Sequence, residues 1–168
     1  MPLVKIEDLP DRARTWVFGS DRTLDADASD SLLNEVDRFL LQWKAHEAPL
    51  TVGREWKYGR FFTIAVDQST TGASGCSLDG LFRTLKAVEP RLGASLVTSG
   101  LIFFRDEKGA IQSVDREQFT ALSAGGKIAP DTQVFDPTVT TLREWRARFE
   151  LNVGDSWHAK LLGKSQPA

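Results

Sequence analysis

The spacing of apolar residues predicts two amphipathic helices in the first two thirds of the chain. Two series of apolar side chains recur at the intervals of one face of a 3.6-residue helix. These series are Leu32, Leu33, Val36, Phe39, Leu40 and Trp43, and then Leu78, Leu81, Phe82, Leu85 and Val88. We expect Asp27 or Ser29 to cap the first helix, and Pro49 to mark its end. Pro90 or Gly93 closes the second.

Runs of β-branched and aromatic residues around these helices predict strands. The runs are residues 15–18, 51–57, 60–66 and 101–105. Tyr58-Gly59 is expected to form the turn between the second run and the third. The order strand, helix, strand, strand, helix, strand is that of the ferredoxin-like βαββαβ arrangement. We therefore expect an α+β protein with a ferredoxin-like body over residues 12–105, an antiparallel sheet with both helices on one face.

The last third of the chain follows another pattern. A second strand over residues 110–114 forms a hairpin with residues 101–105. Asp115 and Gln118 have the spacing of a capping box, which predicts a short helix that ends at Gly125-Gly126. We expect a C-terminal part over residues 101–162 that shares strands with the body. We expect residues 163–168, which are small and polar, to form a disordered tail.

A family resemblance covers part of this C-terminal region. Residues 101–135 resemble the bacterial GYF-2-like domain in having a hairpin, a short capped helix and then Gly-x-Ile-x-Pro-Asp-Thr-x-Val. The positions that carry this motif are Gly126, Ile128, Pro130, Asp131, Thr132 and Val134, with Phe135 following. The resemblance implies a GYF-2-like extension that binds peptides or partner proteins. The candidate contact residues are Trp145, Phe135 and Trp157.

The whole chain also resembles small bacterial proteins, some of which carry the label of ABC-transporter ATPase. A Walker A loop needs Gly, four residues, then Gly-Lys and Ser or Thr, so that backbone amides and a hydroxyl hold phosphate and magnesium. The best candidate is Gly126-Lys127, where Ala121 replaces the first Gly and Ile128 replaces the hydroxyl residue. The chain therefore lacks a Walker A loop.

Composition narrows the class of protein. The 168 residues carry a net charge of −2, which argues against a nucleic-acid partner. One Cys and two His exclude an intrachain disulfide and the common multi-cysteine or three-histidine metal sites, so we expect no metal and no cofactor. The sequence shows neither an apolar leader nor a run of about 18 apolar residues. We expect a soluble, cytoplasmic protein without membrane insertion.

One polar segment, residues 67–77, has the composition of an anion-binding loop. Its glycines let backbone amides turn inward, and the helix that follows offers further amides. The candidate ligand-binding residues are Asp67, Ser69, Gly72, Ser74, Gly75 and Ser77. Without Lys or Arg in the segment, a self-capped surface loop explains the same residues.

Cys76 lies in this segment, before a helix whose N-terminus would favour the thiolate. A nucleophilic thiol needs a base, and the candidate catalytic set pairs Cys76 with His158, oriented by Asp155 or Asp79. A small buried cysteine explains the same residue. Asp67, Asp79 and Asp136 are candidates for a magnesium site, against which caps and turns are the simpler interpretation.

Two functional hypotheses remain. The preferred one is a non-catalytic module that binds a protein or peptide, because the chain has a plausible interaction domain without a complete catalytic set. The alternative is a thiol-dependent enzyme or an anion- or nucleotide-binding protein that uses the 67–77 loop and Cys76.

Overall fold

The computed structural model describes residues 3–45, 48–49, 51–67, 75–96 and 100–162. These residues form an α+β protein that divides into two compact units. The first unit comprises Met1–Thr98 and Pro137–Arg146, and the second comprises Ser99–Asp136 and Ala147–Ala168. The chain therefore leaves the first unit, builds most of the second, and returns to the first for one short segment.

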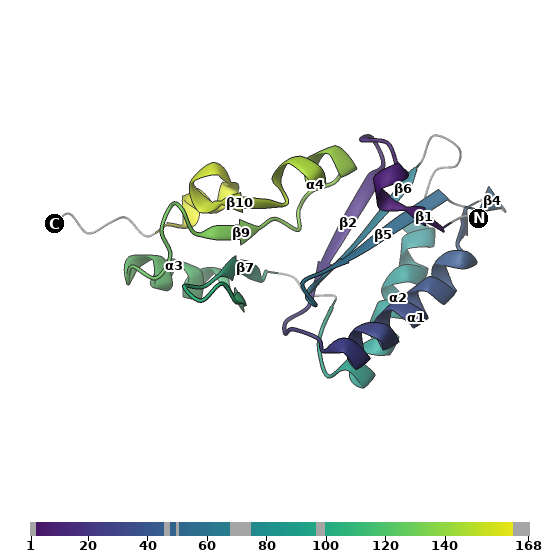
Figure 1. The fold of residues 1–168 in the computed structure, drawn as a ribbon, viewed down its shortest axis with the longest axis horizontal. Helices are drawn as coiled ribbons and strands as arrows, with labels where there is room; N and C mark the ends of the chain where they lie inside the picture. The colour runs from purple at the N-terminus through teal and green to yellow at the C-terminus, as the bar shows by residue number, and fades with distance from the viewer. Residues whose placement is uncertain (1–2, 46–47, 50, 68–74, 97–99, 163–168) are drawn as a thin grey trace. The chain divides into compact units, whose positions relative to one another are not determined.

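The first unit is a mixed sheet with two helices on one face. The strand order is β1-β5-β6-β2, in which β1 runs parallel to β5 and the other neighbours are antiparallel. Figure 1 shows α1 and α2 side by side on the same face of this sheet. The elements are β1 (Leu3–Lys5), β2 (Arg14–Gly19), α1 (Ala26–Leu41), β5 (Thr51–Lys57), β6 (Phe61–Asp67) and α2 (Gly75–Leu92), with a separate ribbon of β3 (Lys44–Ala45) and β4 (Ala48–Pro49).

Local sequence explains these elements, with two corrections at the ends of α1. Tyr58 and Gly59 both have positive φ, 60° and 66°, as a tight β5–β6 turn requires. The cap of α1 is Asp25, whose carboxylate accepts from Ala28 N–H at 2.8 Å, and so the predicted cap at Asp27 or Ser29 is wrong. The helix ends at Leu41, well before Pro49, because the chain turns there into the β3–β4 ribbon.

Residues 101–105 were expected in the first sheet, and their pairing differs from that expectation. The strand β7 (Ile102–Arg105) pairs with β8 (Ile111–Val114) and β9 (Gln133–Phe135) of the second sheet. The returning segment of the chain lies at the outer edge of β2, where Thr15 N–H donates to Thr140 O at 3.0 Å and Arg14 bridges Thr141. Thr140 and Thr141 therefore occupy the position beside β2 that residues 101–105 were predicted to take. The opposite edge of the sheet is formed by β1.

The sheet face opposite α1 and α2 has a small core of its own. Ile6 and Leu9, from the 3-10 turn η1 (Ile6–Asp8) and the residue after it, pack there with Leu142. The turn lies so close to β5 that a Cβ on Gly53 would come within 2.8 Å of Ile6 Cα. Arg146 stabilises the turn, because its Nη2 donates hydrogen bonds to the carbonyl oxygens of Ile6, Glu7 and Leu9.

The second unit is a four-stranded antiparallel sheet in the order β10-β9-β7-β8. Asp115 and Gln118 form the predicted capping box at the start of α3. The core contains Phe104 and Phe119, whose rings meet edge to face at 6.1 Å. The remaining elements are β8 (Ile111–Val114), α3 (Arg116–Ala124), β9 (Gln133–Phe135), α4 (Leu142–Arg148, shared between the units), β10 (Glu150–Asn152), η2 (Val153–Asp155) and η3 (Trp157–Leu161).

No helix among the described residues combines the length and the apolar character needed to cross a bilayer.

Candidate functional site

The second unit gathers charged and aromatic side chains around one buried carboxylate, that of Asp136. Asp136 follows β9 directly, and its backbone N–H donates to Phe149 O at 2.8 Å. Its side chain accepts a hydrogen bond from Arg148 Nη1 at 2.6 Å and another from Trp157 Nε1 at 3.3 Å. Asp136 is only 2% exposed, so its negative charge depends on these donors for compensation. We call Asp136, Arg148, Trp157 and His158 the Asp136 cluster.

His158 contributes the titratable ring of the cluster, and only 1% of its surface is exposed. Ser156 caps η3 by accepting from His158 N–H at 3.1 Å, and its Oγ lies 2.9 Å from His158 Nδ1. The single hydroxyl proton of Ser156 has an acceptor in Val153 O at 3.1 Å. With that proton so placed, the ring proton is assigned to Nδ1, and Nε2 keeps its lone pair.

The surroundings of His158 keep the imidazole neutral. Burial lowers its pKa from 6.5 to about 4, because the charged ring would lose its hydration. The Asp136 carboxylate opposes this shift by attracting the cation, and the Arg116 guanidinium adds to it by repulsion. A general base is most effective when its pKa lies near the working pH, so a ring with this pKa is poorly suited to accept protons at neutral pH.

Trp157 is the member of the cluster that is partly exposed. Its indole stacks on the His158 ring with centroids 3.9 Å apart and planes inclined by 24°. The Arg116 guanidinium lies 5.4 Å from the indole centroid, within the range of a cation–π contact. With its N–H bound to Asp136, the indole is held both by its ring and by its polar edge.

The structure places the predicted catalytic residues in different units. Cys76 is the second residue of α2 in the first unit, and the position of its side chain lies outside what the structure describes. Asp155 and His158 belong to the second unit. Asp155 is exposed, and within the described residues it makes no hydrogen bond to the His158 ring. The carboxylate that acts on His158 is Asp136.

The predicted anion-binding loop is described only at its two ends. Asp67 is the last residue of β6, whereas Gly75 and Ser77 already belong to the first turn of α2. The other predicted ligands of the loop, Ser69, Gly72 and Ser74, lie outside the described residues.

The predicted contact residues also divide between the units. Trp145 belongs to the first unit, where Lys57 Nζ lies 4.8 Å from the centroid of its ring. Phe135 is fully buried and packs against Phe149 with ring centroids 5.7 Å apart. Trp157 and Trp145 are therefore partly exposed, whereas Phe135 lies beneath the surface.

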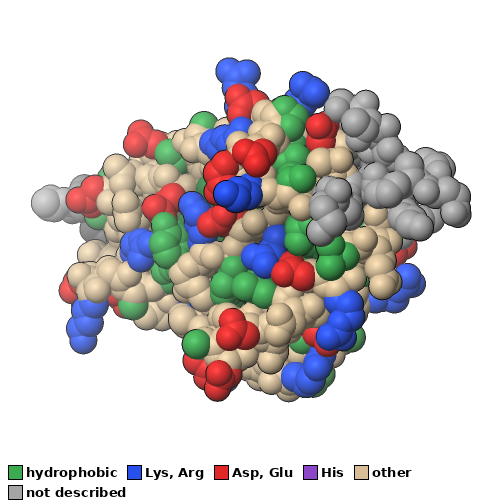
Figure 2. Space-filling model, turned by 45° about the vertical axis from the view of Figure 1, so that its right-hand side comes forward, with side chains coloured by type: hydrophobic (Ala, Val, Ile, Leu, Met, Phe, Trp, Pro, Cys, Tyr) green, Lys and Arg blue, Asp and Glu red, His purple; other side chains and the backbone are tan. Residues whose placement is uncertain are grey.

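Charge is mixed in sign on one face of the molecule. On the face drawn in Figure 2, Lys and Arg side chains lie among Asp and Glu side chains, with small hydrophobic patches between them. In the described part of the chain, no three His, Cys, Asp or Glu side chains come together in a way that could hold a metal ion. In particular, Asp67 and Asp79 lie in the first unit and Asp136 in the second.

Sequence reasoning missed the roles of Arg116 and Arg148 and considered Asp136 only as a metal ligand or turn residue. The available signal was position: Asp136 ends an apolar strand and precedes Pro137, as a polar residue at the end of a buried strand would. Its partners are 12 and 21 residues away, at Arg148 and Trp157. Comparison with family models, curated proteins and solved structures finds no match for this chain.

Proposed function

We propose that this chain is a non-catalytic protein- or peptide-binding module and that its second unit is a GYF-2-like domain whose contact residue is Trp157. The observation that carries the proposal is the support of this partly exposed indole by Asp136, His158 and Arg116. Tryptophan and arginine are the residues most enriched among those that dominate binding energy. A ring fixed before binding loses little conformational freedom when a partner arrives.

The order of elements in the second unit supports the GYF-2-like part of this proposal, because β7, β8, α3 and β9 follow one another as the resemblance implies. For the first unit we propose a variant of the ferredoxin-like arrangement. Its support is the adjacency of β2, β6 and β5 with α1 and α2 on one face. We assign the module to the cytoplasm, since a single cysteine suits a reducing compartment.

The chemistry of His158 also supports binding over catalysis. Because burial lowers the pKa of His158 to about 4, the imidazole is a weak base that takes up few protons at neutral pH. Its flat face is in use as a support for Trp157. Ser156, the hydroxyl in contact with the ring, is engaged in capping η3 and in a contact with Val153 O.

Selection from a displayed random peptide library against the immobilised full-length chain tests the binding function. We expect enriched peptides to lose most of their binding to Trp157→Ala and to retain it with Trp145→Ala, a matched change of a partly exposed tryptophan in the first unit. Thermal unfolding of both variants shows whether each is folded. Equal binding to the wild type and Trp157→Ala, or a library without enrichment, would count against the proposal.

The second candidate, a thiol-dependent enzyme, has one observation in its favour: Cys76 lies in the first turn of an 18-residue helix. Amides at that end favour a thiolate. Because Cys76 is the chain's single cysteine, the rate of alkylation by iodoacetamide against pH reports on this thiol alone. An apparent pKa well below about 8.5 supports the enzyme, and a thiol that is unreactive near neutral pH removes it.

A further inference from the structure

The first unit has a sheet edge that no strand of the described chain covers. β1 is the last strand in the order β1-β5-β6-β2, and its whole length pairs with β5, from Leu3 opposite Val52 to Lys5 opposite Arg54. One side of the β1 backbone therefore faces away from the sheet. Exposed strand edges are the places where an extended chain can add by backbone hydrogen bonding.

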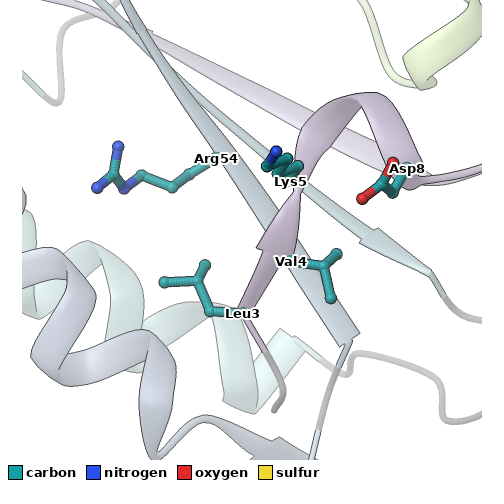
Figure 3. A pocket seen from close by; sticks show the side chains of 5 residues that line it. All are labelled: Leu3, Val4, Lys5, Asp8 and Arg54. Atoms are coloured by element: carbon teal, nitrogen blue, oxygen red, sulfur yellow. The ribbon is translucent and has the colours of Figure 1, made fainter.

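A pocket of about 510 Å³ lies along this edge. It is lined by Leu3, Val4, Lys5, Asp8 and Arg54. Leu3 packs with the core beneath α1 and α2, whereas Val4 packs with the core on the opposite face. Figure 3 shows Leu3 and Arg54 on one side of β1 and Val4 and Asp8 on the other. Because its lining comes from both faces of the sheet, the pocket wraps around the edge of β1.

Cationic groups line the α1 side of this edge. Asp37 of α1 fixes the Arg54 guanidinium with two hydrogen bonds of 2.7 Å, from Nε and from Nη2. These bonds raise the pKa of Arg54, which stays charged. The donors of Nη1 are not used in either bond, and the exposed Lys5 lies at the register position opposite Arg54.

We propose that the edge of β1 binds an extended peptide segment of another protein, which adds to the sheet as a further strand. Its acidic side chains face Lys5 and Arg54, and the alternate side chains, small and apolar, face Val4. Opposite charges across paired strands stabilise a sheet, and alternation in a strand sends successive side chains to opposite faces.

A second copy of this chain fits the edge less well than an acidic segment does. Pairing two β1 edges would bring the Lys5 side chains of both copies to one edge, beside two Arg54 side chains. A lysine on a very short edge strand is a common feature that prevents self-association of sheets. The proposed site belongs to the first unit and does not depend on Trp157.

The test uses a fluorescein-labelled octapeptide of four Val-Asp repeats and the full-length chain, with binding followed by fluorescence anisotropy at low salt. We expect binding by this peptide and none by an octapeptide of four Val-Lys repeats. Lys5→Glu should weaken binding of the acidic peptide by roughly threefold to tenfold, from the loss of an opposite-charge pair and its replacement by a like-charge pair. Lys108→Glu makes the same change in net charge at an exposed turn of the second unit and should leave affinity unchanged.

Two further probes separate strand addition from attraction between charges. Methylation of alternate backbone nitrogens in the acidic peptide should abolish binding, and the bound unmodified peptide should slow amide hydrogen exchange in β1. Trp157→Ala should bind the acidic peptide like the wild type, which separates this site from the proposed function of the second unit.

Absence of binding, equal binding of both peptides, or no effect of Lys5→Glu overturns the proposal. A dimer in sedimentation that Lys5→Glu changes would assign the edge to a second copy instead.

Discussion

The two units each contain an aspartate–arginine pair, and the pairs differ in how deeply the carboxylate is buried. In the first unit, the side chains of Asp37 and Arg54 are 29% and 26% exposed. In the second, the Asp136 side chain is 3% exposed and that of Arg148 is 38% exposed. Water helps to solvate Asp37, whereas Asp136 relies on protein donors, including the indole of Trp157. The aspartate–arginine pair of the first unit is therefore partly solvated, whereas the pair of the second unit has a buried carboxylate whose charge is compensated by protein donors.

The cores show the same contrast. The large core of the first unit is made of apolar residues from α1, α2 and the sheet, and the polar side chains buried among the described residues of that unit, Thr15, Ser20, Arg60 and Thr63, include no carboxylate and no imidazole. The second unit has a smaller core and buries Asp136 and His158, and the His158 ring lies 6.0 Å from that of Phe119 in the core. We expect the stability of the second unit to depend on polar chemistry and pH, and the stability of the first to depend mainly on packing.

The largest effect should follow Asp136→Ala. This change removes the carboxylate that accepts from Arg148 Nη1 and from Trp157 Nε1, and breaking a buried ion pair from one side costs about 3–5 kcal/mol. Because Arg148 is partly exposed, we expect the lower part of that range. Denaturant unfolding followed by circular dichroism measures the loss. A cost below about 1 kcal/mol would show that the Asp136 cluster contributes little to the stability of the second unit.

The next effect is a dependence of stability on pH that comes from His158. Between pH 6.5 and about 4 the unfolded ring binds a proton that the folded ring does not, so the free energy of unfolding falls as the pH falls through this range. The loss should be of the order of 3 kcal/mol and level off once the pH is below the folded pKa. His158→Asn keeps a polar atom near Ser156 and removes the titration.

Unfolding curves of the wild type and His158→Asn at several pH values measure this contribution, because carboxylates titrate in both proteins and cancel in the difference. We expect the difference in stability to shrink as the pH falls from 6.5 to 4. A difference that does not change with pH would mean that the ring is not held neutral in the folded protein.

The smallest effect should come from Asp37→Ala in the first unit. Arg54 can exchange its lost partner for water, so we expect a cost of about 0.5–1 kcal/mol, typical of a partly exposed pair. The same unfolding measurements apply. A cost as large as that of Asp136→Ala would remove the contrast between the units.

Much of the local structure could be predicted from the sequence, because helical periodicity and capping act over a few residues. The capping box at Asp115 and Gln118 and the turn at Tyr58-Gly59 are of this kind. Sheet membership could not be predicted in the same way. The partner of residues 101–105 depends on what else reaches the edge of β2, and Thr140, 125 residues after Thr15, is what reaches it.

The candidate site shows the same limit. Asp155 lies three residues from His158 in the sequence and was the natural partner to predict, yet it is exposed. Asp136, 22 residues before His158, provides the carboxylate that acts on the ring, because β9 brings the chain there. Residue types identified His158 and Trp157 as candidates, but their partners depend on long-range packing.

The central claim, that Trp157 is the contact residue of a binding module, is tested most directly by fluorine NMR of the full-length chain labelled with 5-fluorotryptophan. The five tryptophans give separate signals, and the signal missing from Trp157→Phe identifies Trp157. On titration with a peptide selected from the displayed library, we predict that this signal shifts more than the other four. A Trp157 signal that stays in place while another tryptophan responds would contradict the account.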